Sequence, residues 1–170
     1  TFTATGNNFD EILAVDKGLQ FPATQVADAG ANVLDDYEEG SWTPVIGGSG
    51  GTSGQTYTGQ VGRYLKIGRL VWASFFVQLS AKGTITGSAE IQGLPLTSVG
   101  IANLRNINAT TWQNLATTFV DVVTHQVEDG TVARIRGAAA ATDNSNVDLT
   151  TTNIADTTAL YGTIIYAAAA

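Results

Sequence analysis

The clearest structural signal in this sequence is a regular alternation of side chains over residues 70–79. Successive side chains of a β-strand point to opposite faces, so every second residue of this run would share a face. One such face is wholly apolar and consists of Val71, Ala73, Phe75, Val77 and Leu79. The other is half apolar and consists of Leu70, Trp72, Ser74, Phe76 and Gln78. The pattern predicts a central strand that is covered on both sides.

Shorter segments of the same kind occur along most of the chain. They are rich in β-branched and aromatic residues, and most are bounded by Gly, Asn or Asp. We expect strands at residues 42–46, 56–67, 70–79, 84–91, 101–107, 117–127, 131–136, 147–151 and 159–166. The glycine-rich residues 47–54 are expected to form a long exposed loop. About eight to ten short strands at this spacing predict an all-β body of the β-sandwich or jelly-roll type, with almost no helix.

The acidic residues are concentrated at one end of the sequence. Residues 1–40 contain eight acidic residues and one lysine, whereas residues 41–170 contain seven acidic and seven basic residues. The whole net charge of −7 therefore belongs to the first quarter of the chain. We interpret residues 1–40 as an acidic extended arm and hinge, and residues 41–170 as the β-sandwich body. Within that body, residues 99–170 could form a sub-lobe.

Three segments in the first half of the chain form a series of motifs: FPATQ at residues 21–25, LDDYEEGSWTP at residues 34–44 and GRYLKIG at residues 62–68. This series resembles a module common in virion proteins of tailed bacteriophages, most of them tail-fibre or tail-associated proteins. The resemblance spans residues 18–98. It implies a β-rich, trimeric structural component that faces the outside of a virion and has no enzyme activity.

The acidic residues around Tyr37 are the first candidates for a functional site. Calcium prefers several carboxylates close together, but the spacing here lacks the glycine and the distal glutamate of an EF-hand loop. A pair of glycosidase carboxylates would be expected among many aromatic residues, and only two lie nearby. We therefore favour an acidic surface that docks onto a partner, with the tyrosine and the tryptophan as anchors. The interface candidates are Asp35, Tyr37, Glu38, Glu39 and Trp42.

Other residues that could carry chemistry give weaker signals. His125 is the only histidine, and no Gly-x-Ser-x-Gly motif accompanies it, so we interpret it as a surface or interface residue. The absence of cysteine excludes disulfides and thiolate metal sites. Basic residues lie near Tyr64 and at positions 134 and 136, but nucleic-acid binding is not expected of a chain with a net charge of −7. No apolar run approaches the roughly 20 residues of a membrane helix. We expect no catalytic residue, metal or cofactor.

Two kinds of virion protein fit these features. The first is a homotrimeric capsid decoration or cement protein that docks through its N-terminal arm onto other virion proteins such as the major capsid protein. The alternative is a tip module of a tail fibre or tailspike. Such a module would contact a host surface receptor or glycan through exposed loops at residues 47–54 and 143–146. Either protein would be made in the host cytoplasm and would lie on the virion exterior.

Overall fold

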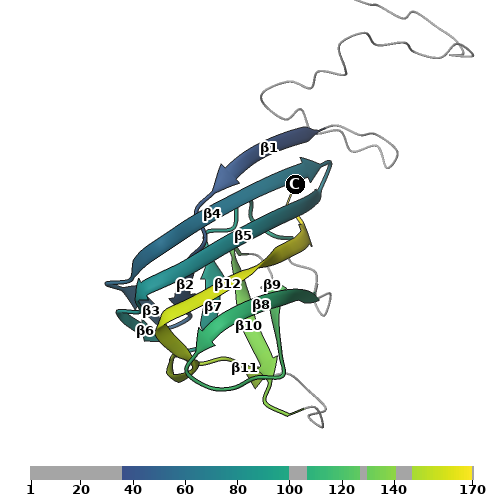
Figure 1. Ribbon diagram of the computed structural model, residues 1–170. Coiled ribbons are helices and arrows are strands. Elements are labelled where there is room, and N and C mark those ends of the chain that lie inside the picture. The colour runs from purple at the N-terminus through teal and green to yellow at the C-terminus, as the bar shows by residue number, and fades with distance from the viewer. Residues whose placement is uncertain (1–35, 100–106, 127–129, 141–146, 170) are drawn as a thin grey trace, which may run out of the picture.

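The computed structural model describes residues 36–99, 107–126, 130–140 and 147–169 (Figure 1). These residues form strands and one short 3-10 helix, and they include no α-helix. In chain order the elements are β1 (Tyr37–Trp42), β2 (Val45–Gly48), β3 (Gly51–Ser53), β4 (Thr56–Ile67), β5 (Leu70–Ala81), β6 (Thr84–Thr86), β7 (Ala89–Gln92), β8 (Ile107–Leu115), β9 (Asp121–Gln126), β10 (Val132–Ala138), β11 (Val147–Asp148), η1 (Thr151–Asn153) and β12 (Ile154–Ala167). The predicted all-β fold class is confirmed.

Most of the strands form one continuous antiparallel sheet in the order β1-β4-β5-β12-β8-β9-β10-β7-β2, and β11 pairs with β10. The sheet bends at β8, because the second half of this strand pairs with β12 whereas residues 107–109 pair with β9. A front layer therefore holds β1, β4, β5 and β12, and a back layer holds β9, β10, β7 and β2 (Figure 1). This curled, two-layered sheet is consistent with the sandwich-like body predicted from the strand spacing.

The hydrophobic core lies between the two layers. In the front layer, all five apolar residues on the predicted inner face of residues 70–79 are buried. The back layer contributes fully buried side chains from β2, β7 and β10, which are Ile46, Ile91, Ala133 and Ile135. The alternation in the sequence thus correctly identified which residues of β5 face the core.

The glycine-rich residues 47–54 differ from the expected loop. Residues 49–54 are exposed as predicted, but residues 51–53 form β3, which pairs with β6 in a separate two-stranded sheet. The strand predicted at residues 84–91 is divided into β6 and β7 at Gly87, whose φ of 82° is a left-handed conformation that favours glycine. The strand predicted at residues 42–46 is interrupted at Thr43 and Pro44. Most of the strand predicted at residues 101–107 lies outside the described residues.

The strands also bear on how the chain is divided. β1 pairs with β4 along its whole length, so the predicted boundary between residues 40 and 41 falls inside a strand of the body. In the second half of the chain, β12 lies between β5 and β8, and β10 lies beside β7. The described strands beyond residue 99 therefore complete the same sheet as the strands before it.

Tyr166 on β12 anchors one end of the core. Its side chain is fully buried. Its hydroxyl group donates to the carbonyl oxygen of Leu96 at 2.9 Å and accepts from the Leu96 amide at 3.2 Å. Burial removes the phenol from water and raises the pKa of Tyr166 from 10 to about 12. The folded state therefore holds this proton more tightly than the unfolded state does.

We expect Tyr166 to contribute to a loss of stability between pH 10 and pH 12. Its stabilising contribution is fully present below the unfolded pKa of 10 and is lost as the pH rises through the folded value of about 12. Urea unfolding of wild type and of Tyr166→Phe across this range tests the expectation. The variant should be less stable at neutral pH, because it lacks the hydroxyl group, and it should lose less stability as the pH rises. Parallel declines of the two proteins would contradict it.

Candidate interaction surface

The front layer has one side against the core and one side toward solvent. Directly paired residues of antiparallel strands point to the same side of a sheet. The register therefore lines up outward-pointing residues from β1, β4, β5 and β12 in rows across the layer. One row is Glu39, Leu65, Trp72 and Ile165, and the adjacent row is Tyr37, Ile67, Leu70 and Ala167. We call this solvent-facing side of the four strands the outer face.

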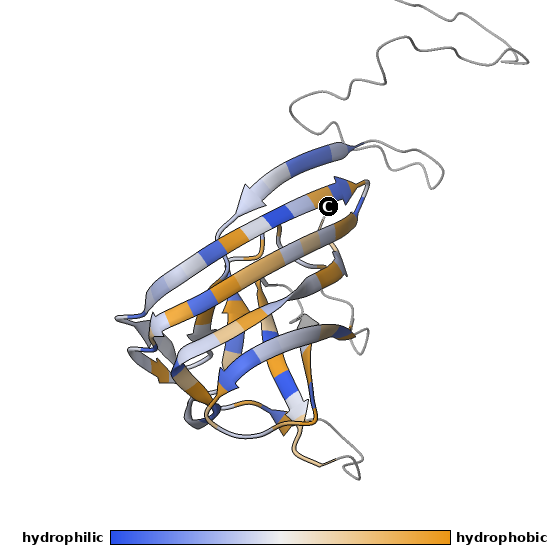
Figure 2. Ribbon diagram, viewed as in Figure 1, coloured by the Kyte–Doolittle hydropathy of each residue, from blue (hydrophilic) through white to orange (hydrophobic). Residues whose placement is uncertain are grey.

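The outer face exposes several large apolar side chains. Leu70 and Trp72 on β5 are 55% and 44% exposed, and Val61 on β4 is 56% exposed. Tyr37, Ile67 and Ile165 are exposed to a similar degree. Figure 2 shows apolar residues along β4 and β5 of this layer. Exposed apolar patches larger than a few hundred Å² commonly mark interaction sites.

The expectation that residues 70–79 are covered on both sides is wrong for the described part of the chain. The back layer covers the inner side of β5, but among the described residues no third layer packs over Leu70 and Trp72. The half-apolar second face of residues 70–79 therefore does not indicate burial within the described part of the chain. It forms an apolar face that the described part of one chain leaves exposed.

Polar and aromatic rows follow the two apolar ones. The next row across the layer is Ser41, Arg63, Ser74 and Thr163. Beyond it, Phe76 and Tyr161 stack with their ring centroids 5.8 Å apart and their planes at 28°. A mixture of large apolar groups, aromatic rings and a few polar side chains is typical of protein–protein interfaces.

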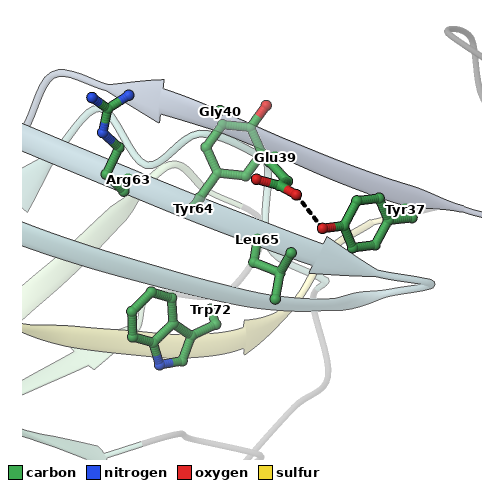
Figure 3. Close-up of a pocket in the computed structure, with 7 residues that line it drawn as sticks. All are labelled: Tyr37, Glu39, Gly40, Arg63, Tyr64, Leu65 and Trp72. Atoms are coloured by element: carbon green, nitrogen blue, oxygen red, sulfur yellow. Dashed lines mark hydrogen bonds between the residues drawn. The ribbon is translucent and has the colours of Figure 1, made fainter. Parts of the chain in front are cut away.

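An open hollow of about 700 Å³ lies in the outer face where β1, β4 and β5 meet (Figure 3). Its lining includes Tyr37, Glu39, Arg63, Leu65 and Trp72. The hydroxyl group of Tyr37 donates a hydrogen bond to the carboxylate of Glu39, and this bond raises the pKa of the tyrosine above its usual value. The bond also restrains the carboxylate, which lies beside the hollow in Figure 3.

Glu39 and Arg63 are the charged side chains of these rows. They occupy neighbouring rows on adjacent strands, since Glu39 pairs with Leu65 and Ser41 pairs with Arg63. Within the described residues neither forms an ion pair, because the ion pairs of this part of the chain join Lys66 to Asp36 and two arginines to Asp148. The outer face thus offers one carboxylate and one guanidinium group that are available to a partner.

The five residues predicted as interface candidates do not act as one group. Tyr37 and Glu39 lie on the outer face, as a docking surface requires. Asp35 lies outside the described residues. Glu38 is half-buried and accepts a hydrogen bond from the hydroxyl group of Tyr64. Trp42 is not a surface anchor, because alternation along β1 turns it inward, where it is buried against Phe75 and donates from Nε1 to the carbonyl oxygen of Ser74 at 3.1 Å.

The inward side chains around the start of β1 and the facing part of β4 form a polar end to the core. Asp36 and Lys66 make an ion pair whose side chains are only 7% and 6% exposed. Beside it, the hydrogen bond from Tyr64 to Glu38 raises the pKa of Tyr64 to about 12, so this tyrosine remains a donor at all physiological pH values. These two contacts attach the start of β1 to β4.

The remaining sequence candidates give no catalytic arrangement within the described residues. His125 occurs on β9, where its backbone pairs with Arg134. Arg134 and Arg136 both contact Asp148, at 2.8 and 2.9 Å, and so form a structural cluster with it. The described part of the chain contains no group of three potential metal ligands and no helix long and apolar enough to cross a membrane.

Comparisons with known proteins returned no match. No family model matches the chain, and no curated protein or solved structure is significantly similar to it. The fold and the surface define an all-β protein with an exposed apolar sheet face. Any more specific function has to be argued from that face and from the motifs of the sequence.

Proposed function

We propose that this chain is a non-enzymatic structural protein of the surface of a tailed-bacteriophage virion. In this proposal it is a homotrimeric capsid decoration or cement protein that attaches through its N-terminal residues to other virion proteins such as the major capsid protein. The resemblance of residues 18–98 supports the virion, and the exposed apolar outer face supports assembly rather than catalysis.

The arrangement of the body suits a protein with one attached end and one free end. The described chain begins at the end of the β4–β5 hairpin where Tyr37 pairs with Ile67. The exposed β3–β6 sheet is connected to the opposite end of the same hairpin (Figure 1). A strand of 12 residues spans roughly 40 Å, at ~3.3 Å per residue. Attachment through the N-terminal segment would therefore place the β3–β6 sheet away from the virion.

That same exposed sheet favours the alternative function, a tip module of a tail fibre or tailspike. Residues 49–54 are all exposed and rich in glycine and hydroxyl groups, which suits contact with a host receptor or glycan. In this case the virion-proximal part of the fibre would precede the body. The other loop assigned to this role, residues 143–146, lies outside the described residues.

The location of the chain on intact virions distinguishes the two functions. An antibody against the body, followed by electron microscopy, should label the whole head if the chain is a decoration protein. Label confined to the tail would establish the fibre alternative instead. Absence of label from purified virions would overturn both.

We expect deletion of residues 1–33 to abolish attachment to the virion and to leave the body folded. The folded body should persist because the strands from β1 onward and the contacts of Asp36 are retained. Circular dichroism would test folding, and co-sedimentation of the purified protein with undecorated heads would test attachment. Binding that survives the deletion would show that the body itself docks.

A further inference from the structure

We propose that the outer face is the surface through which copies of this chain pack together, with Glu39 of one copy paired to Arg63 of the next. This inference rests on the proposed function, because it specifies how a homotrimer would form. The observations that carry it are the apolar area of the face, its charges and the distribution of charge over the whole body.

The apolar area is large enough to contribute a substantial part of an interface. Six large side chains of the outer face are each exposed by about half, and together they present an apolar patch on the order of a few hundred Å². A stable interface buries about 800 Å² from each partner. The polar row and the Phe76–Tyr161 pair lie on the same face and can supply the remainder.

The charges of the face match a second copy better than a strongly charged partner. The outward-pointing rows carry one acidic group, Glu39, and one basic group, Arg63. A nucleic acid or a strongly basic protein would leave one of these groups opposite a like charge. A second copy brings one group of each sign, so every carboxylate can meet a guanidinium group.

The whole body also permits copies to approach. The described residues contain seven acidic and six basic side chains, so the body is almost neutral. Long-range repulsion between copies is therefore weak in this part of the molecule. The hydrogen bond from Tyr37 restrains the Glu39 carboxylate in advance, which lowers the entropy lost when a partner binds.

Glu39 and Arg63 lie close to Trp72, and we place the centre of the interface at this tryptophan. Glu39, Arg63 and Trp72 all line the hollow of the outer face (Figure 3). Buried aromatic residues at the centre of an interface commonly carry much of the binding energy. Within the described part of the chain, Glu39 and Arg63 form no ion pair. A second copy can therefore supply an oppositely charged partner for each of them.

The test is a mixing experiment with two charge reversals, Glu39→Arg and Arg63→Glu. Sedimentation equilibrium should show a trimer for wild type and association weakened by about tenfold or more for each variant alone, because like charges then face each other. An equal mixture of the two variants should associate more tightly than either alone, because two of the three interfaces of a mixed trimer again bring opposite charges together at positions 39 and 63, although the third interface still joins like charges. Only contact between chains can be repaired by mixing.

Two further variants complete the experiment, one outside the outer face and one at its largest exposed side chain. Thr84→Glu adds a negative charge at an exposed position of β6, away from the outer face, and should leave the trimer intact. Trp72→Ser should dissociate the trimer, because it removes the largest exposed side chain of the outer face, and urea unfolding of the monomeric variant measures separately how much packing within one chain is lost, since the side chain is 44% exposed.

The outcomes separate this inference from the proposed function. If wild type is trimeric and none of the outer-face variants affects association, the outer face is not the interface, although the homotrimer stands. If each charge variant dissociates and the mixture does not recover, the Glu39–Arg63 pairing is wrong. A wild-type monomer at micromolar concentration would overturn both the homotrimer and this interface, whatever the label on virions shows.

Discussion

Lys66→Ala is expected to lower the free energy of unfolding by about 3–5 kcal/mol, the usual cost of removing one partner of a buried ion pair. The side chains of Lys66 and Asp36 are only 6% and 7% exposed, so water cannot replace the missing ammonium group. The carboxylate of Asp36 would then be a buried charge that has lost its cation. Urea unfolding at neutral pH measures the effect, and Asp36→Ala should cost a similar amount.

Lys82→Ala is the matched control for this substitution. Lys82 also has restricted exposure, but its ammonium group contacts the backbone carbonyl oxygens of Thr151 and Ile154 at 3.4 and 3.0 Å rather than a buried carboxylate. Loss of these bonds leaves no unpaired charge, so we expect a cost of about 1 kcal/mol. Equal costs for the two lysines would show that the ion pair has no special role.

The double variant Asp36→Leu with Lys66→Met sharpens the same argument. Replacing both partners of a buried pair with apolar residues is often close to neutral, because it also removes the desolvation cost of two charges. The double variant should therefore be much more stable than either single alanine variant. If the costs of the single substitutions simply add, the two residues do not interact in the way the structure shows.

The alternation over β5 was readable from the sequence, but its surroundings were not. Alternation reports which side chains share a face, and the five inner residues of residues 70–79 are buried as predicted. Whether the second face is covered depends on how many layers the whole chain builds. That depends on pairings between distant strands, such as Trp72 with Ile165, which no local pattern encodes.

The acidic motif at residues 35–39 shows a second limit of sequence reasoning. Its high charge suggested one acidic surface that docks onto a partner, and the alternation of its side chains between two faces was missed. In the structure Glu38 and Trp42 point inward whereas Tyr37 and Glu39 point outward. The inward carboxylates are stabilised by partners on β4, because Lys66 forms an ion pair with Asp36 and Tyr64 donates a hydrogen bond to Glu38. The alternation was the signal that could have identified this division.

Gly62→Ala is expected to destabilise the body by about 1–3 kcal/mol, the usual cost of adding a methyl group to a packed core. Gly62 on β4 pairs with Trp42 on β1, and a Cβ atom at this position would lie 2.6 Å from Cδ1 and Nε1 of the indole ring. The ring cannot easily move, because it packs edge-on against Phe75 at 6.2 Å and its Nε1 donates to the carbonyl oxygen of Ser74.

Gly40→Ala provides the comparison one row away on the same pair of strands. Its Cβ would lie 2.5 Å from Cε1 of Tyr64, a contact as close as the one at Gly62. Tyr64 is only half-buried, so its ring can shift toward solvent, and we expect a smaller cost. Similar costs would mean that both rings yield equally.

A double-mutant cycle with Trp42→Phe identifies the cause of the Gly62 effect. Phenylalanine lacks the second ring of tryptophan and leaves space beside residue 62, so Gly62→Ala should cost less in that background. If the cost is the same, the methyl group acts through backbone conformation rather than through the indole. If it falls, the strand pair β1–β4 is held by an aromatic ring laid across a glycine, an arrangement known to stabilise glycine within sheets. In that case the sequence has a glycine at residue 62 and a tryptophan at residue 42 because of how β1 and β4 pack together.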